Sequence, residues 1–490
     1  MQKKVAVIGA GFSGLTAACY LAKGNYKVTV VDKLKEVGGR AQVLRRDGFT
    51  FDMGPSWYWM PEVFEDFFND FGHSVDQYYK LERLDPGYRV FFGKQDFIDI
   101  PADWQELVTL FESLEAGSTS KLEAFMNAAR QKYEIAMGSY IQKPGLSPFE
   151  FFDFQSLKYA SKLDLVKSIK KLVAKHFKHP KIRSILEFPV LFLGALPKDI
   201  PGLYTLMNYA DLKLGTWYPA GGMGEIPKAM KAVAEEMGVE FRLNTNVESI
   251  VVEGKEASGL KVHGKVEGFD IILGSADYYH VDQKLLPTKY RNYSPKYWDK
   301  RVLAPSALLY YIALDKKVDS LLHHNLFFDE DFEKHGKEIY DDPKWPEKPQ
   351  MYVSVASRTD DSIAPKGKDA LVGLIPVAVG LKDTPEIRKA YEEKLIDKIE
   401  MLTGERIREH VLFVESYAQS NFINDYNSFK GNAYGLANTL KQTAFLKPKI
   451  RNTKLSNLFY AGQLTVPGAG VPPAILSGKI VAKEIQKTFK

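Results

Sequence analysis

The sequence predicts an α/β fold that begins with a Rossmann-type dinucleotide-binding domain. An apolar run at 5–8 leads into the glycine-rich turn Gly9-x-Gly11-x-x-Gly14, and a helical stretch of small residues follows at 15–21. A second, β-branched run at 28–31 ends in an acid, Asp32. A continuous apolar run is typical of a strand that is buried on both faces of a parallel sheet. Strand, glycines, helix, strand and acid in this order form the dinucleotide-binding pattern. The alternative is a strand–helix turn that binds nothing.

Each residue of the glycine-rich turn has its own expected role. Gly9 permits the tight turn, Gly11 lets a pyrophosphate approach the backbone, and Gly14 lets the helix pack closely on the strand. The helix that begins near Ser13 directs free N–H groups and a partial positive charge at the phosphates. At the end of the second strand, Asp32 can accept hydrogen bonds from ribose hydroxyls.

Two loops extend this predicted site. Lys33 follows the acid, and Gly38-Gly39-Arg40 comes soon after it. The two glycines allow close backbone approach, and the arginine supplies a fixed cation beside a pyrophosphate. A flexible turn with a solvated arginine is the alternative. Further on, Gly54-Pro55-Ser56 is a backbone-rich loop that suits the face of a flat ring system.

The composition limits the class of protein. The chain has 490 residues, which at about 150 residues per domain suggests roughly three domains. Its net charge of +5 is mild and gives no reason to expect a nucleic-acid partner. The single cysteine, Cys19, excludes an internal disulfide. Because the chain opens on a strand and no apolar run approaches ~20 residues, we expect neither signal peptide nor membrane span, and we expect an intracellular protein.

Residues 155–183 predict a basic amphipathic helix. The segment carries eight lysines, Arg183 and two histidines against one acid, Asp164. Its apolar stripe consists of Leu165, Val166, Ile169, Leu172, Val173 and Phe177. At ~1.5 Å per residue the helix is too short to cross a bilayer, and Pro180 is expected to end it. Taken alone, the pattern fits equally well a helix on an anionic membrane surface and a core-facing stripe with a solvated basic face.

Other segments supply candidate core and site residues. Phe64, Phe67, Phe68 and Phe71 recur at helical spacing and are expected to be core. Strands are expected at 247–252 and 271–274, the second leading into a small-residue turn at Ala276-Asp277. The pair His323-His324 suggests a metal site, but adjacent side chains on a strand face opposite ways and no acid or cysteine cluster accompanies them. We therefore expect no metal.

Several of these motifs together resemble the bacterial carotenoid (phytoene-type) desaturases, within the amine-oxidase-like flavoproteins. The motifs are Gly-Gly-Arg-Ala at 38–41, Phe-x-Phe-Asp-x-Gly-Pro-Ser at 49–56, the glycine loop at 217–227, and Pro-Gly-Ala-Gly at 467–470. The sequence departs from the family at Asp32, where glutamate is usual, and at Lys447, where arginine is usual. The resemblance covers nearly the whole chain and implies FAD as the cofactor. It further implies that Val247 holds the adenine, that Ala276 and Asp277 close the dinucleotide site, and that Gly462, Gln463, Gly470 and Val471 face the ribityl chain and the isoalloxazine.

The resemblance implies a discontinuous FAD-binding domain, a mixed-sheet substrate domain and a helical membrane-facing region. The expected segments are FAD-binding 1–75, 216–280 and 431–490, a helical region at 76–215 and a substrate sheet at 281–430. Residues 62–153 are expected to be mixed helix and loop. The implied reaction puts C=C bonds into a carotenoid, of the phytoene type or a hydroxycarotenoid desaturated at the 3,4 position. No side-chain set identifies a catalytic acid or base. A soluble flavin amine oxidase and a carotenoid isomerase are the alternatives.

A carotenoid substrate would favour a membrane contact. Moving apolar carbon into water costs about 0.8 kcal/mol per methylene, so a polyene of roughly forty carbons faces a cost on the order of 30 kcal/mol. Such a substrate stays in the bilayer, and the enzyme must meet it there. We therefore expect a cytoplasmic protein that lies on the inner face of the cell membrane through 155–183. The oligomeric state and the acceptor that reoxidises the flavin stay open.

Overall fold

A five-stranded parallel sheet joins three distant parts of the chain. The computed structural model describes residues 2–151, 163–165 and 167–489. The strands of this sheet are, from edge to edge, β19 (Leu458–Tyr460), β13 (Ile271–Gly274), β1 (Lys4–Ile8), β2 (Lys27–Val31) and β9 (Glu240–Arg242). In the central strand, the residues from Val5 to Ile8 are buried. The apolar run at 5–8 is thus a doubly covered parallel strand, as the sequence predicts.

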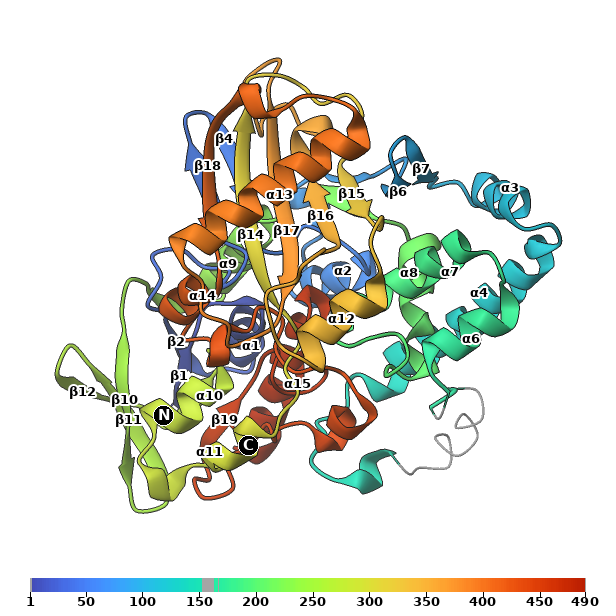
Figure 1. Ribbon diagram of the computed structural model, residues 1–490. Coiled ribbons are helices and arrows are strands. Elements are labelled where there is room, and N and C mark those ends of the chain that lie inside the picture. Colours follow the sequence, from blue (N-terminus) through green and yellow to red (C-terminus); the bar gives the residue numbers. More distant parts are fainter. Residues whose placement is uncertain (1, 152–162, 166, 490) are drawn as a thin grey trace.

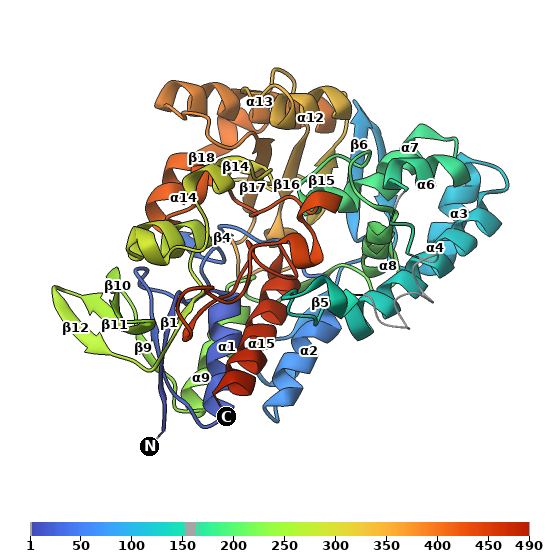
Figure 2. The same cartoon turned by 90° about the horizontal axis from the view of Figure 1, so that it is seen from below.

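Four helices lie side by side next to this sheet. They are α9 (Glu225–Glu236), α1 (Phe12–Lys23), α15 (Val471–Thr488) and α2 (Pro61–Asp70), and Figure 2 shows them side by side. Gly478 lets α15 approach α1, because a Cβ atom at this position would collide with the backbone carbonyl of Ser13. A three-stranded sheet of β10 (Val247–Glu253), β11 (Glu256–Val262) and β12 (Lys265–Gly268) forms a separate lobe beside the parallel sheet (Figure 1).

The second large sheet has seven strands and is mixed. Its order is β18 (Val411–Tyr417), β14 (Ser306–Leu314), β17 (Asp369–Val377), β16 (Met351–Ser354), β15 (His324–Phe327), β6 (Tyr88–Gly93) and β7 (Asp96–Ile100). All pairs are antiparallel except β15 with β6. The helix α13 (Pro385–Thr403) covers one face, where Leu395 contacts the bare backbone at Gly373. A mixed second sheet was expected, but β6 and β7 lie in a region expected to be helix and loop.

Helices of the middle of the chain pack beside this sheet. They are α3 (Trp104–Leu114), α4 (Ser118–Ile135), α6 (Ile169–His176), α7 (Pro180–Glu187) and α8 (Leu206–Leu212), and they form the right-hand lobe of Figure 1. The remaining helices are α10 (Tyr278–His280), α11 (Pro295–Asp299), α12 (Phe332–Tyr340) and α14 (Gln419–Tyr426). Two small sheets pair β3 (Val43–Arg46) with β4 (Phe49–Asp52), and β5 (Leu81–Arg83) with β8 (Trp217–Pro219). Within the described residues, no helix is both long and apolar enough to span a membrane.

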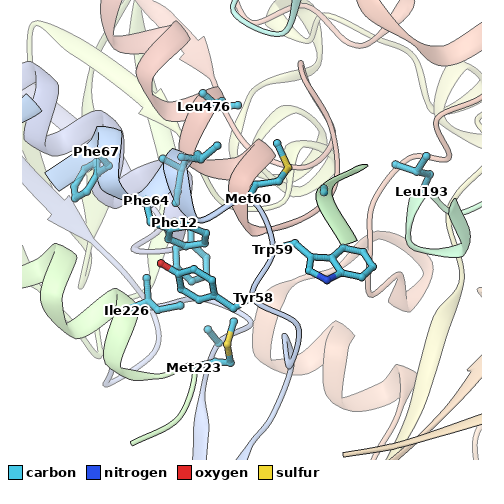
Figure 3. Close-up of a cluster of buried hydrophobic side chains, with 14 of the residues drawn as sticks. Phe12, Tyr58, Trp59, Met60, Phe64, Phe67, Leu193, Met223, Ile226 and Leu476 are labelled. Atoms are coloured by element: carbon cyan, nitrogen blue, oxygen red, sulfur yellow. The ribbon is translucent and has the colours of Figure 1, made fainter. Parts of the chain in front are cut away.

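The largest apolar core joins the helical row to the segment before α2. Phe64, Phe67 and Phe68 are buried and Phe71 packs at the edge, so the prediction that these residues form core is confirmed. Figure 3 shows how residues of α1, α2, α9 and α15 meet around Tyr58, whose ring stacks on Phe64 with the centroids 4.2 Å apart. This core fixes the segment after Gly54-Pro55-Ser56, and with it the position of that loop.

Candidate active site

The glycine-rich turn forms one end of the site. Gly9 has a φ of +110°, and Gly11 caps α1 without any side-chain hydrogen bond to its first N–H groups. A Cβ at Gly14 would collide with the Gly9 carbonyl, whereas a Cβ at Gly11 would come no closer than 3.8 Å to its nearest neighbour, the Gly39 Cα. Gly14 therefore serves packing, and Gly11 borders open space in front of the helix N-terminus.

Two buried carboxylates support the backbone around this turn. Asp32 accepts hydrogen bonds from the backbone N–H of Ala10 (2.6 Å) and of Leu34 (2.7 Å). Asp277 accepts from the N–H of Phe429 (3.3 Å) and caps α10. Burial raises the pKa of both groups, while these N–H donors oppose that rise. Each oxygen of Asp32 keeps lone-pair capacity toward the cavity described below.

Arg40 is half-buried, and its Nε atom lies out of contact with solvent. Its guanidinium donates to Ser428 Oγ and to the Asn432 carbonyl, both at 3.2 Å, and lies 5.3 Å from the centroid of the Tyr426 ring. Burial lowers its pKa, and the negative charge of Asp277 counteracts this. The Nε atom is buried without a hydrogen-bond partner in the described residues. A guanidinium with a buried, unused donor is suited to an anionic ligand.

The C-terminal segment closes the site from the other side. Gly470, with a φ of +111°, begins α15, and the Gly462 N–H donates to Ser477 Oγ at 3.0 Å. Because Ser477 lies on α15, this bond ties the turn after β19 to the helix. The N-termini of α1 and α15 thus border the same space from two ends of the chain.

One cavity of about 480 Å³ collects the predicted site residues. Its wall includes Gly9, Gly11, Ser13, Asp32, Lys33, Gly38, Gly39, Arg40, Gly54, Pro55, Ser56, Val247, Ala276, Asp277, Gly462, Gln463, Gly470 and Val471. Gly14, which packs behind the turn, is the one predicted site residue outside that wall. The structure therefore brings together segments that lie more than 450 residues apart.

Beyond the glycine loops the same cavity becomes an apolar chamber. Its floor is the mixed sheet, where Leu326, Tyr352 and Leu374 face each other across β15, β16 and β17 in one row. Its other apolar walls are Trp59, Met60, Phe188, Leu191, Leu193, Leu196, Met207, Phe328, Phe332 and Ile339. Sequence reasoning missed this chamber, because the pairing of strands that builds its floor has no local pattern.

Contrary to the sequence prediction, the two adjacent histidines do not point to opposite faces of a strand. His323 precedes β15 rather than lying within it, so its ring does not take the opposite face; the two ring centroids are 4.4 Å apart. His324 Nδ1 lies 2.6 Å from the Tyr352 hydroxyl, and Tyr352 donates to Ser56 Oγ at 2.9 Å. Tyr352 and Ser56 border the cavity, and His324 stacks on Trp57 at 4.1 Å.

The basic segment at 155–183 also differs in part from the predicted amphipathic helix. Residues 155–162 and Val166 lie outside the described residues; the described part continues with α6, which ends at His176, and α7, which begins at Pro180. Pro180 therefore starts a helix instead of ending one. Ile169, Leu172, Val173 and Phe177 are buried in the protein core, while the lysines of α6 are exposed. Leu165 of the predicted stripe is exposed, whereas α6 itself has the geometry of a core-facing stripe with a solvated basic face, one of the two interpretations that the pattern left open.

Comparison with known proteins identifies the family of this chain. Residues 12–486 match the family described as flavin containing amine oxidoreductase. The chain belongs to this family. The chain is 39% identical over 482 residues to a carotenoid 3,4-desaturase of Haloarcula japonica, across 98% of this chain and 97% of the relative. It is 33% identical over 506 residues to a 4,4'-diapophytoene desaturase (4,4'-diaponeurosporene-forming) of Staphylococcus aureus, across 99% of each chain. The resemblance stated from the sequence motifs is confirmed.

Solved structures agree on the fold of this flavin oxidoreductase. A Methanosarcina mazei oxidoreductase superposes with a TM-score of 0.65 at 17% identity, over 98% of this chain and 100% of that one. FAD is the cofactor, as the sequence predicts. The residues present fit it: the space at Gly11 takes no protein side chain, and Arg40 has a buried, unused donor for a pyrophosphate oxygen. When bound, FAD supplies the hydride acceptor, and the protein supplies its placement.

Proposed function

We propose that this chain is an FAD-dependent carotenoid desaturase that introduces C=C bonds into a long isoprenoid polyene. The observation that carries the proposal is the continuity of one cavity from the glycine loops into the apolar chamber on β15–β17. Polyene carbons need an apolar wall, since each methylene left in water costs about 0.8 kcal/mol. The identities of 39% and 33% with carotenoid desaturases support the same substrate class.

The residues of the cavity wall take roles in this proposal. Gly9, Gly11, Ser13 and Arg40 receive the pyrophosphate, and Asp32 the ribose of the adenosine half. Val247 contacts the adenine. Residues 462–471 and the loop at 54–56 would hold the flavin ring, which supplies the hydride acceptor, at the end of the cavity next to the apolar chamber.

The test is anaerobic mixing of the oxidised enzyme with a carotenoid in liposomes. The flavin absorption at about 450 nm, which belongs to the cofactor, should bleach, and the product should absorb further to the red because conjugation lengthens. Phytoene-type, hydroxylated and thirty-carbon substrates are compared in parallel. Bleaching by an amine and by no carotenoid would replace the proposal with an amine oxidase. A geometric isomer without an added double bond would replace it with an isomerase.

A peripheral contact with the inner face of the cell membrane belongs to the same proposal. A carotenoid does not leave the bilayer unaided, and α6 presents exposed lysines on one side of the helical lobe. Because the apolar stripe of α6 is buried, this contact is electrostatic rather than an insertion of that stripe. Its strength should therefore depend on anionic lipid and fall with salt.

A further inference from the structure

A buried chain of three polar side chains ends at the boundary between the flavin loop and the apolar chamber. Ser56 Oγ, the Tyr352 hydroxyl and His324 Nδ1 follow one another at 2.9 Å and 2.6 Å. Ser56 comes from the loop at 54–56, Tyr352 from β16, and His324 from β15. The first two border the cavity, and the histidine lies behind them, fully buried.

The histidine is held as a neutral base. Its ring stacks on Trp57, and Nε2 is buried without a hydrogen-bond partner in the described residues. Burial and the neighbouring His323 lower the pKa of His324 well below its usual value. The Tyr352 hydroxyl donates to Ser56 Oγ here; because hydroxyl hydrogens rotate and imidazole has two tautomers, the same hydrogen can turn to the Nδ1 lone pair of His324.

Other titratable groups near the chamber are less suited to accept a proton. His335 also borders the cavity, but Nε2 lies 2.9 Å from the Pro376 carbonyl, and Nδ1 accepts from the Gln350 N–H. Both nitrogens are thus occupied. The Tyr434 phenol borders the chamber too, but no described residue hydrogen-bonds to it.

We propose that Tyr352, backed by His324, takes the proton that the substrate loses during desaturation. This rests on the proposed function. The electron pair of one C–H bond leaves as hydride to the flavin. The electron pair of the neighbouring C–H bond becomes the new C=C bond. Its proton goes to the Tyr352 oxygen, which passes its own proton to His324 Nδ1. The proton returns to water through the same hydroxyls after the product has left.

The strength of this base matches the chemistry. Loss of hydride leaves positive charge on carbon, and a C–H bond next to such a carbon is strongly acidic. A neutral imidazole in an apolar surrounding is therefore a sufficient acceptor, and a carboxylate is not required. In this step Tyr352 is the catalytic residue, and His324 acts through it as a positioning and accepting residue.

The test compares Tyr352→Phe, His324→Gln and the double variant with wild type and with Tyr434→Phe as the matched control. Anaerobic bleaching of the flavin by carotenoid should slow by about 10²-fold or more in Tyr352→Phe, the range of general acid–base catalysis. The bleaching rate of the double variant should be no lower than that of the slower single variant, because both single variants break the same relay. FAD content, midpoint potential and carotenoid affinity should stay unchanged in Tyr352→Phe, whereas a structural role would move them.

Three results would overturn the relay. They are a Tyr352→Phe variant as fast as wild type, an equal loss in Tyr434→Phe, and losses that multiply in the double variant. Tyr352→Phe keeps the ring and its packing, so the proposal stays testable even where His324→Gln fails to fold. A wild-type enzyme that desaturates no carotenoid removes the proposed function and the relay with it, whereas a fast Tyr352→Phe beside an active wild type overturns the relay alone.

Discussion

The backbone N–H of Ala10 donates to Asp32 Oδ2 at 2.6 Å, while the other carboxylate oxygen accepts from Leu34. One side chain thus joins the glycine-rich turn to the end of β2. An asparagine can offer only one oxygen, and its NH₂ group would face the second N–H donor. Asp32→Asn should therefore raise the dissociation constant of FAD by roughly tenfold or more, since hydrogen bonds to charged groups contribute about 1.5–3 kcal/mol.

Titration of the apoprotein with FAD measures this effect. The matched control is Asp270→Asn at the opposite end of β1, where Asp270 Oδ2 accepts from the Lys4 N–H at 2.7 Å. Equal FAD affinity in both variants would show that the Asp32 bonds do not support the turn.

The second position of the glycine pattern, Gly11, can be separated from the third, Gly14. A side chain at Gly11 meets no protein atom closer than 3.8 Å at its Cβ, and the φ of −76° suits any residue. Gly11→Val should therefore fold but lose FAD, because the side chain occupies the space at the helix N-terminus. Gly14→Ala should fail to fold, because its Cβ collides with the Gly9 carbonyl. Circular dichroism and flavin content distinguish the outcomes, and a yellow Gly11→Val protein would refute the site.

A buried acid outside the cavity wall makes stability depend on pH. Asp211 accepts from the Tyr88 hydroxyl at 2.8 Å, and burial raises its pKa to about 7. A raised carboxyl pKa contributes stability at low pH that is lost as pH rises from the unfolded value near 3.8 to about 7. The loss is on the order of 4 kcal/mol at 1.4 kcal/mol per unit.

Asp211→Asn removes this titration and keeps an acceptor for Tyr88. Urea unfolding should show that the variant gains stability over wild type between pH 4 and pH 7, with no further gain above pH 8. A stability difference that is the same at every pH would contradict the assignment of the titration to Asp211.

How much could be predicted from the sequence depends on the distance over which each feature is encoded. The glycine turn, Asp32 and Arg40 lie in one local pattern of 40 residues, and the structure places all of them except Gly14 around one cavity. The Ser56–Tyr352 contact joins residues 296 positions apart, and the strand pairing that positions Tyr352 has no local pattern. In the stripe of α6 the pattern is local, but it does not determine the environment. The same periodicity occurs in helices that face a protein core and in helices that lie on a membrane surface.

The membrane proposal predicts a charge effect confined to α6 and the residues before it. Lys167, Lys170, Lys171 and Lys175 are exposed. Changing all four to Gln should weaken flotation with anionic liposomes at low salt, since each basic residue near such a surface contributes about 1 kcal/mol. The matched control changes Lys255, Lys265, Lys284 and Lys289, which are exposed. They belong to the β10–β12 sheet and to the segment after α10, which lie on the opposite side from α6 in Figure 1. Equal flotation of the two quadruple variants would remove α6 as the contact.

The packing of α15 against α1 has a consequence for how the protein is made. The two helices begin more than 450 residues apart, so a ribosome adding about 5–20 residues per second releases the second about 25 to 90 seconds after the first. During that interval the apolar side of α1 has no permanent cover and the cofactor has only part of its site. Nascent chains should therefore need a chaperone, and FAD supplied during synthesis can be captured only at the end of translation.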